Sequence, residues 1–244
     1  MPKKPWIDTR LTEEEMNFLW QIISEENKQN WNDNLAGNIS KSELIEDKDN
    51  WFFKSTLKEL IERMFYRDWD NYRKYHIEKE EPLPKFEMNM FWVNYQKQYE
   101  FNPLHYHGGL FSFVIFVKIP THWKEQYALP ISANSIAPHA SDFLFVWTEK
   151  NSELLTSNFQ LSPEDEGRIL FFPAWLQHMV YPFYGTEEER ITISGNIRLY
   201  EPNKRKIQQE VPVDVYEEKE KNLKFLENSV RVIKEELKMM KKEE

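Results

Sequence analysis

Apolar segments that end at proline or glycine constrain the fold of this chain more than any other feature. The longest runs from residue 110 to 119, contains β-branched and aromatic residues almost without interruption, and is followed by Pro120. Such a run is typical of a strand that is buried on both faces. Residues 143–147 and 168–172 have similar compositions, and Pro173 ends the second of them. The sequence therefore predicts a mainly β core.

A fourth segment, residues 190–197, alternates between apolar and polar side chains. Because successive side chains on a strand point to opposite faces, Ile191, Ile193 and Ile197 are expected on one face. The other face then carries Arg190, Thr192, Ser194 and Asn196. That polar face is expected to line a wet cavity, in which a guanidinium group is well suited to binding a carboxylate through two hydrogen bonds.

Three histidines stand beside the ends of these predicted strands. His105 and His107 are separated by one residue, so an extended backbone directs both imidazoles to the same side. Gly108 and Gly109 follow them and interrupt regular strand pairing. His178 lies a few residues beyond another short strand. Because neutral imidazole binds iron, zinc, copper and nickel, the sequence predicts a mononuclear metal site.

Together these motifs resemble the Fe(II)- and 2-oxoglutarate-dependent dioxygenases. Members of that superfamily carry His-x-Asp/Glu, a distal His and Arg-x-Ser/Thr on a double-stranded β-helix, or jelly roll. The resemblance covers residues 86 to 200 and implies a jelly-roll core with helices beside it. Four short stretches of the sequence are similar to those of the phage-encoded, prolyl-4-hydroxylase-like branch of the superfamily. They are residues 91–94, 102–107, 172–178 and 190–197.

Carried onto this chain, the resemblance implies that His105 and His178 bind Fe(II). It places His107 where most members have a carboxylate, and it makes Arg190 and Thr192 partners of the distal carboxylate of 2-oxoglutarate. The implied reaction consumes O2 and 2-oxoglutarate, releases succinate and CO2, and hydroxylates a peptidyl residue, with proline as one candidate, or a small molecule.

The histidine at position 107 is a departure from that family pattern. A neutral ligand in place of an anionic one changes the charge and the metal preference of the centre. Three-histidine iron sites occur in other β-barrel dioxygenases, so His107 is expected to bind the metal. The alternative is that His107 lies outside the ligand set and that a distant acid, Asp142, completes it.

Two other functions remain open from the sequence. One is a three-histidine metal dioxygenase that does not use 2-oxoglutarate, and the other is a noncatalytic jelly-roll module with a binding or structural role. Arg190 and Thr192 favour the 2-oxoglutarate enzyme over both.

Several further side chains have an ordinary structural explanation beside a functional one. His76, His122 and His139 are expected to be hydrogen-bonded structural residues. Asn94 and Asn196 are candidates for the cosubstrate cavity, but each can equally satisfy a backbone group in a barrel corner. Trp92 and Trp175 could wall the cavity, although core packing is the commoner role. The irregular segment 122–142 is either a loop over the site or a surface excursion.

The N-terminal part of the chain carries helical patterns. Thr12 and Glu15 form a capping box ahead of an apolar stripe, which predicts a helix over residues 12–28. A second helix is expected over residues 51–72. The polar segment at residues 30–50 is expected to be a loop with a short turn of helix. Residues 1–85 are thus expected to brace the outside of the β core at 86–200.

The last segment, residues 201–244, differs in kind from the β core. Apolar residues spaced three and four apart between Leu223 and Met240 predict an amphipathic helix in a strongly charged stretch. Such a helix is expected either to pair with its copy in a homodimer or to fold back on its own domain.

Composition excludes several classes of function. The chain of 244 residues has no cysteine, so disulfides, thiolate metal sites and cysteine nucleophiles are ruled out. The net charge of −9 counts against nonspecific binding to nucleic acid. No apolar stretch is long enough to span a membrane, and no signal peptide is recognisable, so we expect a cytoplasmic protein, in the host cytoplasm if it is phage-encoded.

Overall fold

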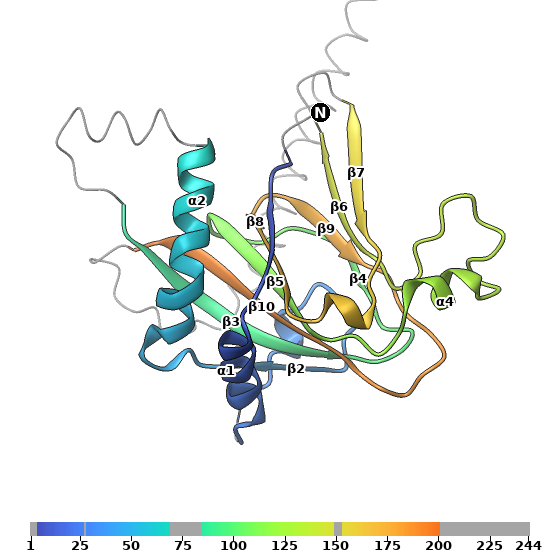
Figure 1. Ribbon diagram of the computed structural model, residues 1–244, viewed down its shortest axis with the longest axis horizontal. Coiled ribbons are helices and arrows are strands. Elements are labelled where there is room, and N and C mark those ends of the chain that lie inside the picture. The colour runs from blue at the N-terminus through green and yellow to red at the C-terminus, as the bar shows by residue number, and fades with distance from the viewer. Residues whose placement is uncertain (1–3, 27, 69–83, 149–152, 201–244) are drawn as a thin grey trace, which may run out of the picture. The chain divides into compact units, whose positions relative to one another are not determined.

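The computed structural model describes residues 4–26, 28–68, 84–148 and 153–200, and in them two antiparallel β-sheets face each other (Figure 1). The strands are β1 (Ile7–Arg10), β2 (Lys41–Leu44), β3 (Phe86–Gln96), β4 (Asn102–His105), β5 (Phe111–Lys118), β6 (Phe143–Thr148), β7 (Leu154–Phe159), β8 (Arg168–Pro173), β9 (Gln177–Val180) and β10 (Arg190–Leu199). The helices are α1 (Glu13–Ser24), α2 (Lys58–Asp68) and α4 (Trp123–Ala128), with single turns at Asn32–Asn34, Lys48–Asn50 and Pro163–Asp165.

The order of the strands identifies the fold as a double-stranded β-helix. One sheet has the order β1-β8-β5-β10-β3-β2 and the other has the order β4-β9-β6-β7. From β3 to β10 the chain passes back and forth between the two sheets, and only the β6–β7 hairpin stays within one of them. The expected mainly β, jelly-roll core is therefore confirmed.

Helix α1 begins at the predicted capping box. The Thr12 hydroxyl accepts a hydrogen bond from the Glu15 amide, and the Glu15 carboxylate accepts one from the Thr12 amide. The helix ends at Ser24, four residues earlier than the pattern suggested. Its buried residues, among them Leu19 and Ile23, pack on the larger sheet.

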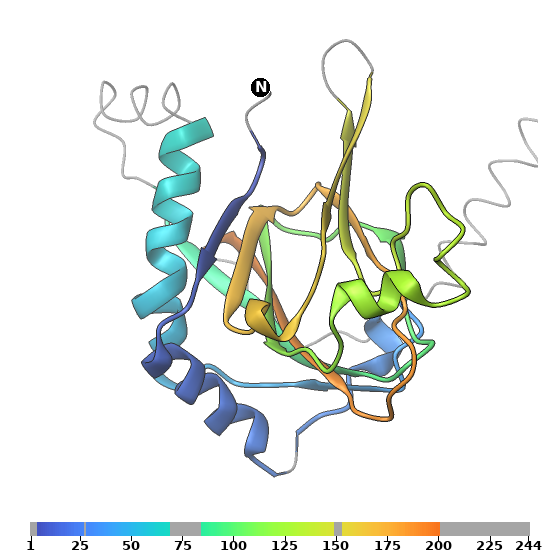
Figure 2. The same cartoon turned by 45° about the vertical axis from the view of Figure 1, so that its right-hand side comes forward.

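The second helical segment begins with a π-helical turn, Phe53–Leu57, that leads directly into α2. Its apolar stripe, which includes Leu57, Leu60 and Met64, is buried against the same face of the larger sheet as α1. Figures 1 and 2 show both helices along this sheet. The predicted bracing role of the two helices is confirmed for the described residues.

A second apolar cluster lies between the sheets. It joins aromatic side chains of β5, β6, β7 and β8, with Phe116, Phe145 and Phe172 almost fully buried. Strand β5 contributes to both clusters, which explains why its sequence is apolar without alternation. The remaining space between the sheets is available for a polar cavity.

The N-terminal region contributes more to the fold than the two expected helices. Strand β1 pairs with β8, and β2 pairs with β3, so both lie at the edges of the larger sheet. Neither strand was predicted, nor was β7. Each is short or half polar, and its pairing with distant strands, rather than its own composition, makes it a strand.

Some predictions fall on residues outside the described ranges. These are the amphipathic helix after residue 200, the end of the second helix beyond residue 68, and His76. Among the residues that are described, no helix has both the length and the apolar character needed to cross a bilayer.

Candidate metal centre

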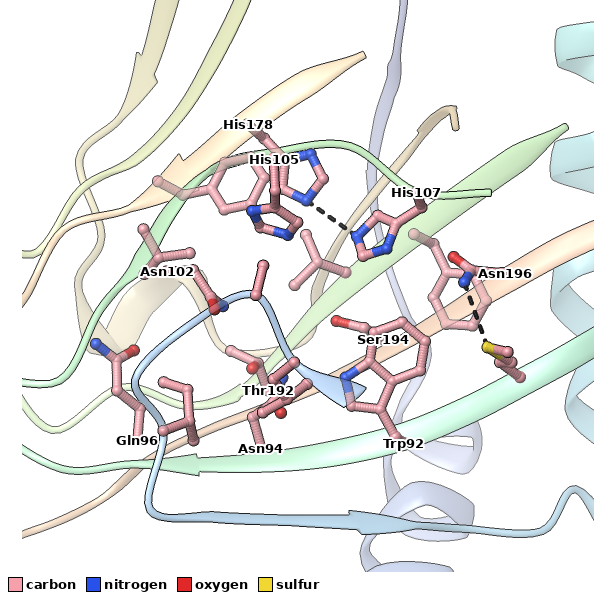
Figure 3. Close-up of a pocket in the computed structure, with 18 of the residues that line it drawn as sticks. Trp92, Asn94, Gln96, Asn102, His105, His107, His178, Thr192, Ser194 and Asn196 are labelled. Atoms are coloured by element: carbon pink, nitrogen blue, oxygen red, sulfur yellow. Dashed lines mark hydrogen bonds between the residues drawn. The ribbon is translucent and has the colours of Figure 1, made fainter. Parts of the chain in front are cut away.

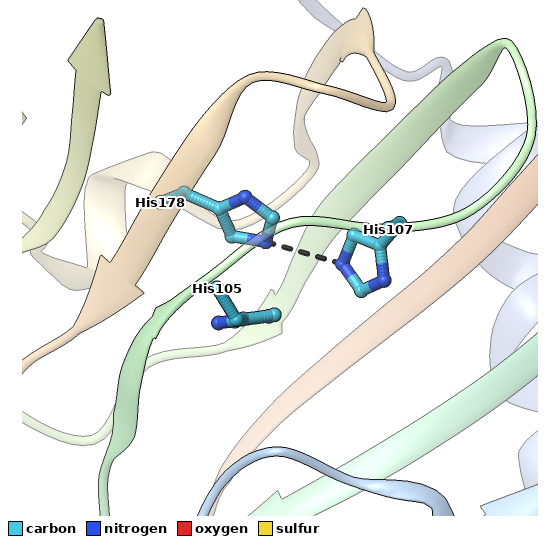
Figure 4. Close-up of side chains that lie close together, drawn as sticks. All are labelled: His105, His107 and His178. Atoms are coloured by element: carbon cyan, nitrogen blue, oxygen red, sulfur yellow. Dashed lines mark hydrogen bonds between the residues drawn. The ribbon is translucent and has the colours of Figure 1, made fainter. Parts of the chain in front are cut away.

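Three histidines converge between the two sheets. His105 ends β4, His178 lies on the neighbouring strand β9, and the Cα atoms of the two are paired across these strands. His107 follows β4, where its backbone amide donates to the Ala174 carbonyl at 3.0 Å. One nitrogen from each ring lies within 4.8 Å of the other two (Figure 4).

Hydrogen bonds orient two of the three rings. The Nδ1 atom of His105 lies 2.7 Å from the Pro103 carbonyl, and the Nδ1 atom of His178 lies 3.0 Å from the Leu176 carbonyl. A carbonyl only accepts, so each Nδ1 carries the proton and each Nε2 keeps a lone pair. Histidines that bind metals are held in this way by a partner at the other nitrogen.

All three imidazoles are neutral at pH 7. Burial lowers the pKa of His105. Burial and the adjacent His105 ring lower the pKa of His107 to about 4. His178 is 4% exposed, and its burial together with the two neighbouring rings brings its pKa well below the usual value. Neutral rings are the form that ligates a metal.

The spacing of the nitrogens suits a metal ion. The Nε2 atoms of His107 and His178 are 3.2 Å apart. Two ligand nitrogens bound at about 2.1 Å and at right angles lie about 3.0 Å from each other. The donor set therefore fits a divalent ion that accepts imidazole. Asp142, the alternative ligand, is not in this cluster.

A cavity of about 150 Å³ opens beneath the histidines (Figure 3). Its wall includes all seven predicted site residues, which are His105, His107, His178, Arg190, Thr192, Asn94 and Asn196. The polar residues of β10 face this cavity, while Ile191, Ile193 and Ile197 pack in the helix-covered cluster on the opposite face. The predicted alternation of this strand is confirmed.

Arg190 is the most unusual polar residue of the cavity. Its side chain is fully buried, and burial lowers its pKa to about 10, so it is still charged at pH 7. Its Nη2 donates to the carbonyl and to the hydroxyl of Ser141. The Nε and Nη1 atoms have no hydrogen-bond partner among the described residues. An unpaired buried guanidinium is costly, which indicates that an anion completes it.

Ser141 and Asp142 lie behind Arg190. Ser141 is fully buried with a left-handed backbone (φ 74°), a costly conformation for a residue other than glycine, and it presents two acceptors to the guanidinium. Asp142 favours the charged form of Arg190 but does not line the cavity. Its Oδ2 accepts from Tyr127, His139 and Asn158. Its carboxylate is thus committed to a separate cluster.

The side chains of Asn94 and Asn196 line the cavity and are held in place by hydrogen bonds. Asn94 accepts from the Ser42 hydroxyl at 2.9 Å, and Asn196 accepts from the Ser112 hydroxyl at 3.0 Å. Both residues therefore line the cavity, and their partners are serine hydroxyls rather than the backbone groups that were the alternative. Gln96 also lines the cavity, and the alternation of Trp92, Asn94 and Gln96 on β3 would have predicted it.

Residues 31–39 form a cavity wall that sequence reasoning missed. Trp31, Ala36 and Ile39 contact the cavity, and the Asn38 amide donates to the Phe101 carbonyl at 2.9 Å beside β4. The expected loop with a short helical turn is present, with the turn at Asn32–Asn34, but nothing in the composition of the segment predicts a cavity wall. The segment expected as a possible cover, residues 122–142, forms α4 and a surface loop, and none of its residues lines the cavity.

The remaining candidates divide between structural and cavity roles. His122 accepts from the Lys124 amide at the start of α4, and His139 pairs with Asp142, so both have the expected structural roles. Trp92 lines the cavity and is 5% exposed. Trp175 is 59% exposed, so its expected packing in the core is wrong. The turn between β8 and β9 carries it outward.

Comparison with protein families gives one match. Residues 90–196 match the family model described as "Putative 2OG-Fe(II) oxygenase", where 2OG is 2-oxoglutarate. This segment contains every predicted site residue. No curated protein matches the sequence significantly. The family match does not show whether the chain belongs to the expected phage-encoded branch.

Solved structures with similar folds are distant in sequence. An oxidoreductase of the 2OG-Fe(II) oxygenase family from Burkholderia pseudomallei is 8% identical, with 80% of this chain and 85% of that chain covered and a TM-score of 0.47. A Pseudomonas putida prolyl-4-hydroxylase is 13% identical, with 81% and 94% covered and a TM-score of 0.44. A viral collagen prolyl hydroxylase from Paramecium Bursaria Chlorella virus-1 is 13% identical, with 81% and 97% covered and a TM-score of 0.42.

Proposed function

We propose that this protein, an Fe(II)- and 2-oxoglutarate-dependent oxygenase whose family domain spans residues 90–196, hydroxylates its substrate. In the balanced reaction, 2-oxoglutarate, O2 and a substrate C–H group give succinate, CO2 and a C–OH group. The family shares Fe(II), 2-oxoglutarate and O2, so the open questions are which residues hold them and what the substrate is.

The two unpartnered nitrogens of the buried Arg190 guanidinium carry the proposal. Its Nε and Nη1 atoms are buried and have no hydrogen-bond partner in the described part of the chain, while Nη2 donates to Ser141. Hydrogen bonds from a charged guanidinium N–H to a carboxylate oxygen are stronger than those between neutral groups. We assign this position to the distal carboxylate of 2-oxoglutarate, with Thr192, the next cavity-facing residue of β10, beside it.

The three histidines are assigned as the Fe(II) ligands. His105 and His178 direct lone pairs to the same point because backbone carbonyls hold their other nitrogens. His107 supplies the third ligand in place of a carboxylate. Bound there, Fe(II) supplies the activation of O2 and of 2-oxoglutarate.

The rest of the cavity keeps the cosubstrate in place and excludes water. Asn94 and Asn196 form polar walls whose side chains are held by Ser42 and Ser112. Phe143 and Phe172 also line the cavity and pack against His178, with ring centroids 5.6 Å and 5.0 Å from that of His178. Dry walls strengthen the contact between a buried charge and its ligand.

The size of the cavity bears on the substrate. At about 150 Å³ it is smaller than pockets that enclose a drug-sized ligand, for which 300 Å³ is roughly the lower bound. Metal and cosubstrate leave room for one small group, so a larger substrate enters by a single side chain. We propose a peptidyl residue, with proline among the candidates, or a small molecule.

Isotopically labelled O2 provides the test. Protein loaded with Fe(II) is incubated with 2-oxoglutarate and a mixture of peptides and small acids, and succinate is analysed by mass spectrometry. We expect succinate that contains one labelled oxygen atom, and Arg190→Gln should raise the 2-oxoglutarate concentration that is required. Arg168→Gln, outside the cavity, is the matched control.

One observation favours a second function. The histidine at position 107 removes the anionic ligand, so a three-histidine dioxygenase that oxidises its substrate without 2-oxoglutarate would use the same ligands. That enzyme would consume O2 with no labelled succinate, and Arg190→Gln would leave its kinetics unchanged.

A further inference from the structure

The Trp92 indole is a second unpartnered donor in the cavity. Trp92 is 5% exposed and lines the cavity from β3, yet its Nε1–H group has no hydrogen-bond partner among the described residues. A buried indole N–H normally finds an acceptor. Its ring lies beside His107, with ring centroids 5.7 Å apart.

Trp92 and Arg190 lie at opposite ends of the cavity floor. In the pairing of β3 with β10, Arg190 is opposite Gln96, and Ser194 is opposite Trp92. Arg190 and Ser194 are four residues apart on one strand, a separation of about 13 Å. Figure 3 shows Gln96 at one side of the view, and Trp92 and Ser194 toward the other side, below His107.

The length of the cosubstrate decides which ligand can reach Trp92. A five-carbon diacid in an extended zigzag spans about 5 Å between its terminal carboxyl carbons, given carbon–carbon bonds of about 1.5 Å. With one carboxylate on Arg190, the other end reaches the middle of the floor, under the histidines. The Trp92 donor therefore lies beyond the cosubstrate, on the side left for the substrate.

Neighbouring side chains add donors at that end. The Asn196 oxygen accepts from Ser112, so its Nδ2 is the group available to a ligand. Among the residues that the structure describes, that nitrogen has one partner, the Met90 sulfur at 3.8 Å, and a thioether is a weak acceptor. Ser194 brings a hydroxyl to the same wall. A group that accepts several hydrogen bonds fits here.

The charge of the cavity points to an anion. None of the described residues that line it is acidic, and Arg190 is its one cation. A divalent metal ion and Arg190 bring three positive charges, while 2-oxoglutarate brings two negative charges. Among the groups that line or enter the cavity, one positive charge is left because His107 is neutral. Asp142 interacts with Arg190 from outside the lining, where Tyr127, His139 and Asn158 share its Oδ2. An unbalanced buried charge favours an ion of the opposite sign.

We propose that the substrate carries a carboxylate and that Trp92 Nε1, with Asn196 and Ser194, binds it at the end of the cavity beyond the cosubstrate. This assignment rests on the proposed function, because the charge balance and the position of Trp92 beyond the cosubstrate both assume that 2-oxoglutarate binds Arg190. It narrows the substrate class to small carboxylic acids and to peptides that present an acidic side chain or a terminal carboxylate.

Nuclear magnetic resonance of the indole N–H groups tests the assignment without turnover. The full chain is loaded with Zn(II), which is redox-inert, and with 2-oxoglutarate. Its nine tryptophans give separate indole signals, and Trp92→Phe identifies the one from Trp92. Acetate is then titrated into one sample and acetamide into another. Acetamide is an uncharged molecule of similar shape that fits the same small space.

We expect 2-oxoglutarate alone to shift the N–H signals of residues near Arg190. The Trp92 indole signal should stay at the position of an N–H group that makes no hydrogen bond. Acetate should then move the Trp92 signal downfield to saturation, with an affinity at least about tenfold above that of acetamide. In Trp92→Phe, acetate binding is followed at the backbone amide signal of Ser194, and the affinity for acetate should fall by about tenfold. Trp175→Phe, at an exposed tryptophan, should not change it.

Each contrary result has a separate meaning. If 2-oxoglutarate shifts nothing, the proposed function and this assignment both fail. If 2-oxoglutarate binds but itself occupies the Trp92 N–H, or if acetate and acetamide bind equally, the carboxylate site is wrong and the proposed function stands.

Discussion

The Nε2 atoms of His107 and His178 lie 3.2 Å apart, although the residues are 71 positions apart in the chain. Both rings are neutral, and the Nδ1 proton of His178 is committed to the Leu176 carbonyl. The lone pair of His178 therefore points at His107 and needs a proton or a metal ion between the two rings. A metal ion satisfies His105 at the same time.

Replacing His107 tests its place in the ligand set. We expect His107→Ala to weaken Fe(II) binding at least about tenfold, because losing even a partner of a ligand costs that much. His107→Asp should retain one equivalent of Fe(II), since it restores the carboxylate of the wider family. Calorimetric titration under anaerobic conditions measures both, with His122→Ala as a control outside the cavity. Unchanged affinity in His107→Ala would remove His107 from the ligands.

Arg190 should contribute to function at the expense of stability. Arg190→Met removes a buried guanidinium with two unpartnered nitrogens, so the free energy of unfolding of the metal-free protein should rise. Affinity for 2-oxoglutarate should fall about 10- to 100-fold, as expected for lost hydrogen bonds to a charged group. Denaturant unfolding and calorimetry measure the two effects.

Arg168→Met is the matched comparison for that variant. Arg168 pairs with Asp8 and Asp165 on the surface side of β8. Its loss should lower stability slightly and leave cosubstrate affinity unchanged. If Arg190→Met destabilises the metal-free protein, the guanidinium is a structural residue, contrary to our assignment.

The histidine pKa values predict an acid-sensitive metal-free protein. Folding lowers the pKa of His107 from its ordinary 6.5 to about 4, so the unfolded chain binds more protons between these values. Stability is therefore complete above pH 6.5 and is lost as the pH falls toward 4. Melting temperatures measured over this range should fall with acid, and His107→Asn should flatten the curve. His122→Asn, which keeps an N-cap residue at α4, should not.

The strands that bear the site could be predicted because their own residues determine them. On β10, alternation alone separated Arg190 and Thr192 from Ile191 and Ile193, and the structure confirms that division. The spacing of His105 and His107 and the position of His178 were informative for the same reason. These signals are local, and burial on one face fixes them.

Features that depend on distant contacts were not predicted. Strand β2 exists because it pairs with β3, and residues 31–39 line the cavity because they lie beside β4. The support of Arg190 by Ser141 joins two residues 49 positions apart. Nothing in the composition of these segments differs from that of an ordinary loop, so only the folded chain reveals them.

Gly37 should be essential for the wall formed by residues 31–39. A Cβ atom at this position would lie 1.6 Å from the Asn102 side chain and 2.7 Å from the Phe101 carbonyl. Gly37→Ala must therefore move the segment away from β4. We expect affinity for 2-oxoglutarate to fall several-fold, because water then enters the cavity.

Gly108→Ala is the comparison for that change, since a Cβ there meets nothing within 4 Å. Hydrogen exchange at the Asn38 amide, which donates to Phe101, reports on the wall directly. Exchange should quicken in Gly37→Ala alone. Equal protection in both variants would show that the wall does not depend on Gly37.

The most direct test of the account is an anaerobic titration with Fe(II) and then 2-oxoglutarate, followed in the visible spectrum. Chelation of the metal by the cosubstrate gives a charge-transfer band. We predict a saturable band in the wild type, no band in His178→Ala, and a band in Arg190→Met that needs about 10- to 100-fold more 2-oxoglutarate. Fe(II) binding without a band in the wild type would contradict the assignment of this cavity to 2-oxoglutarate.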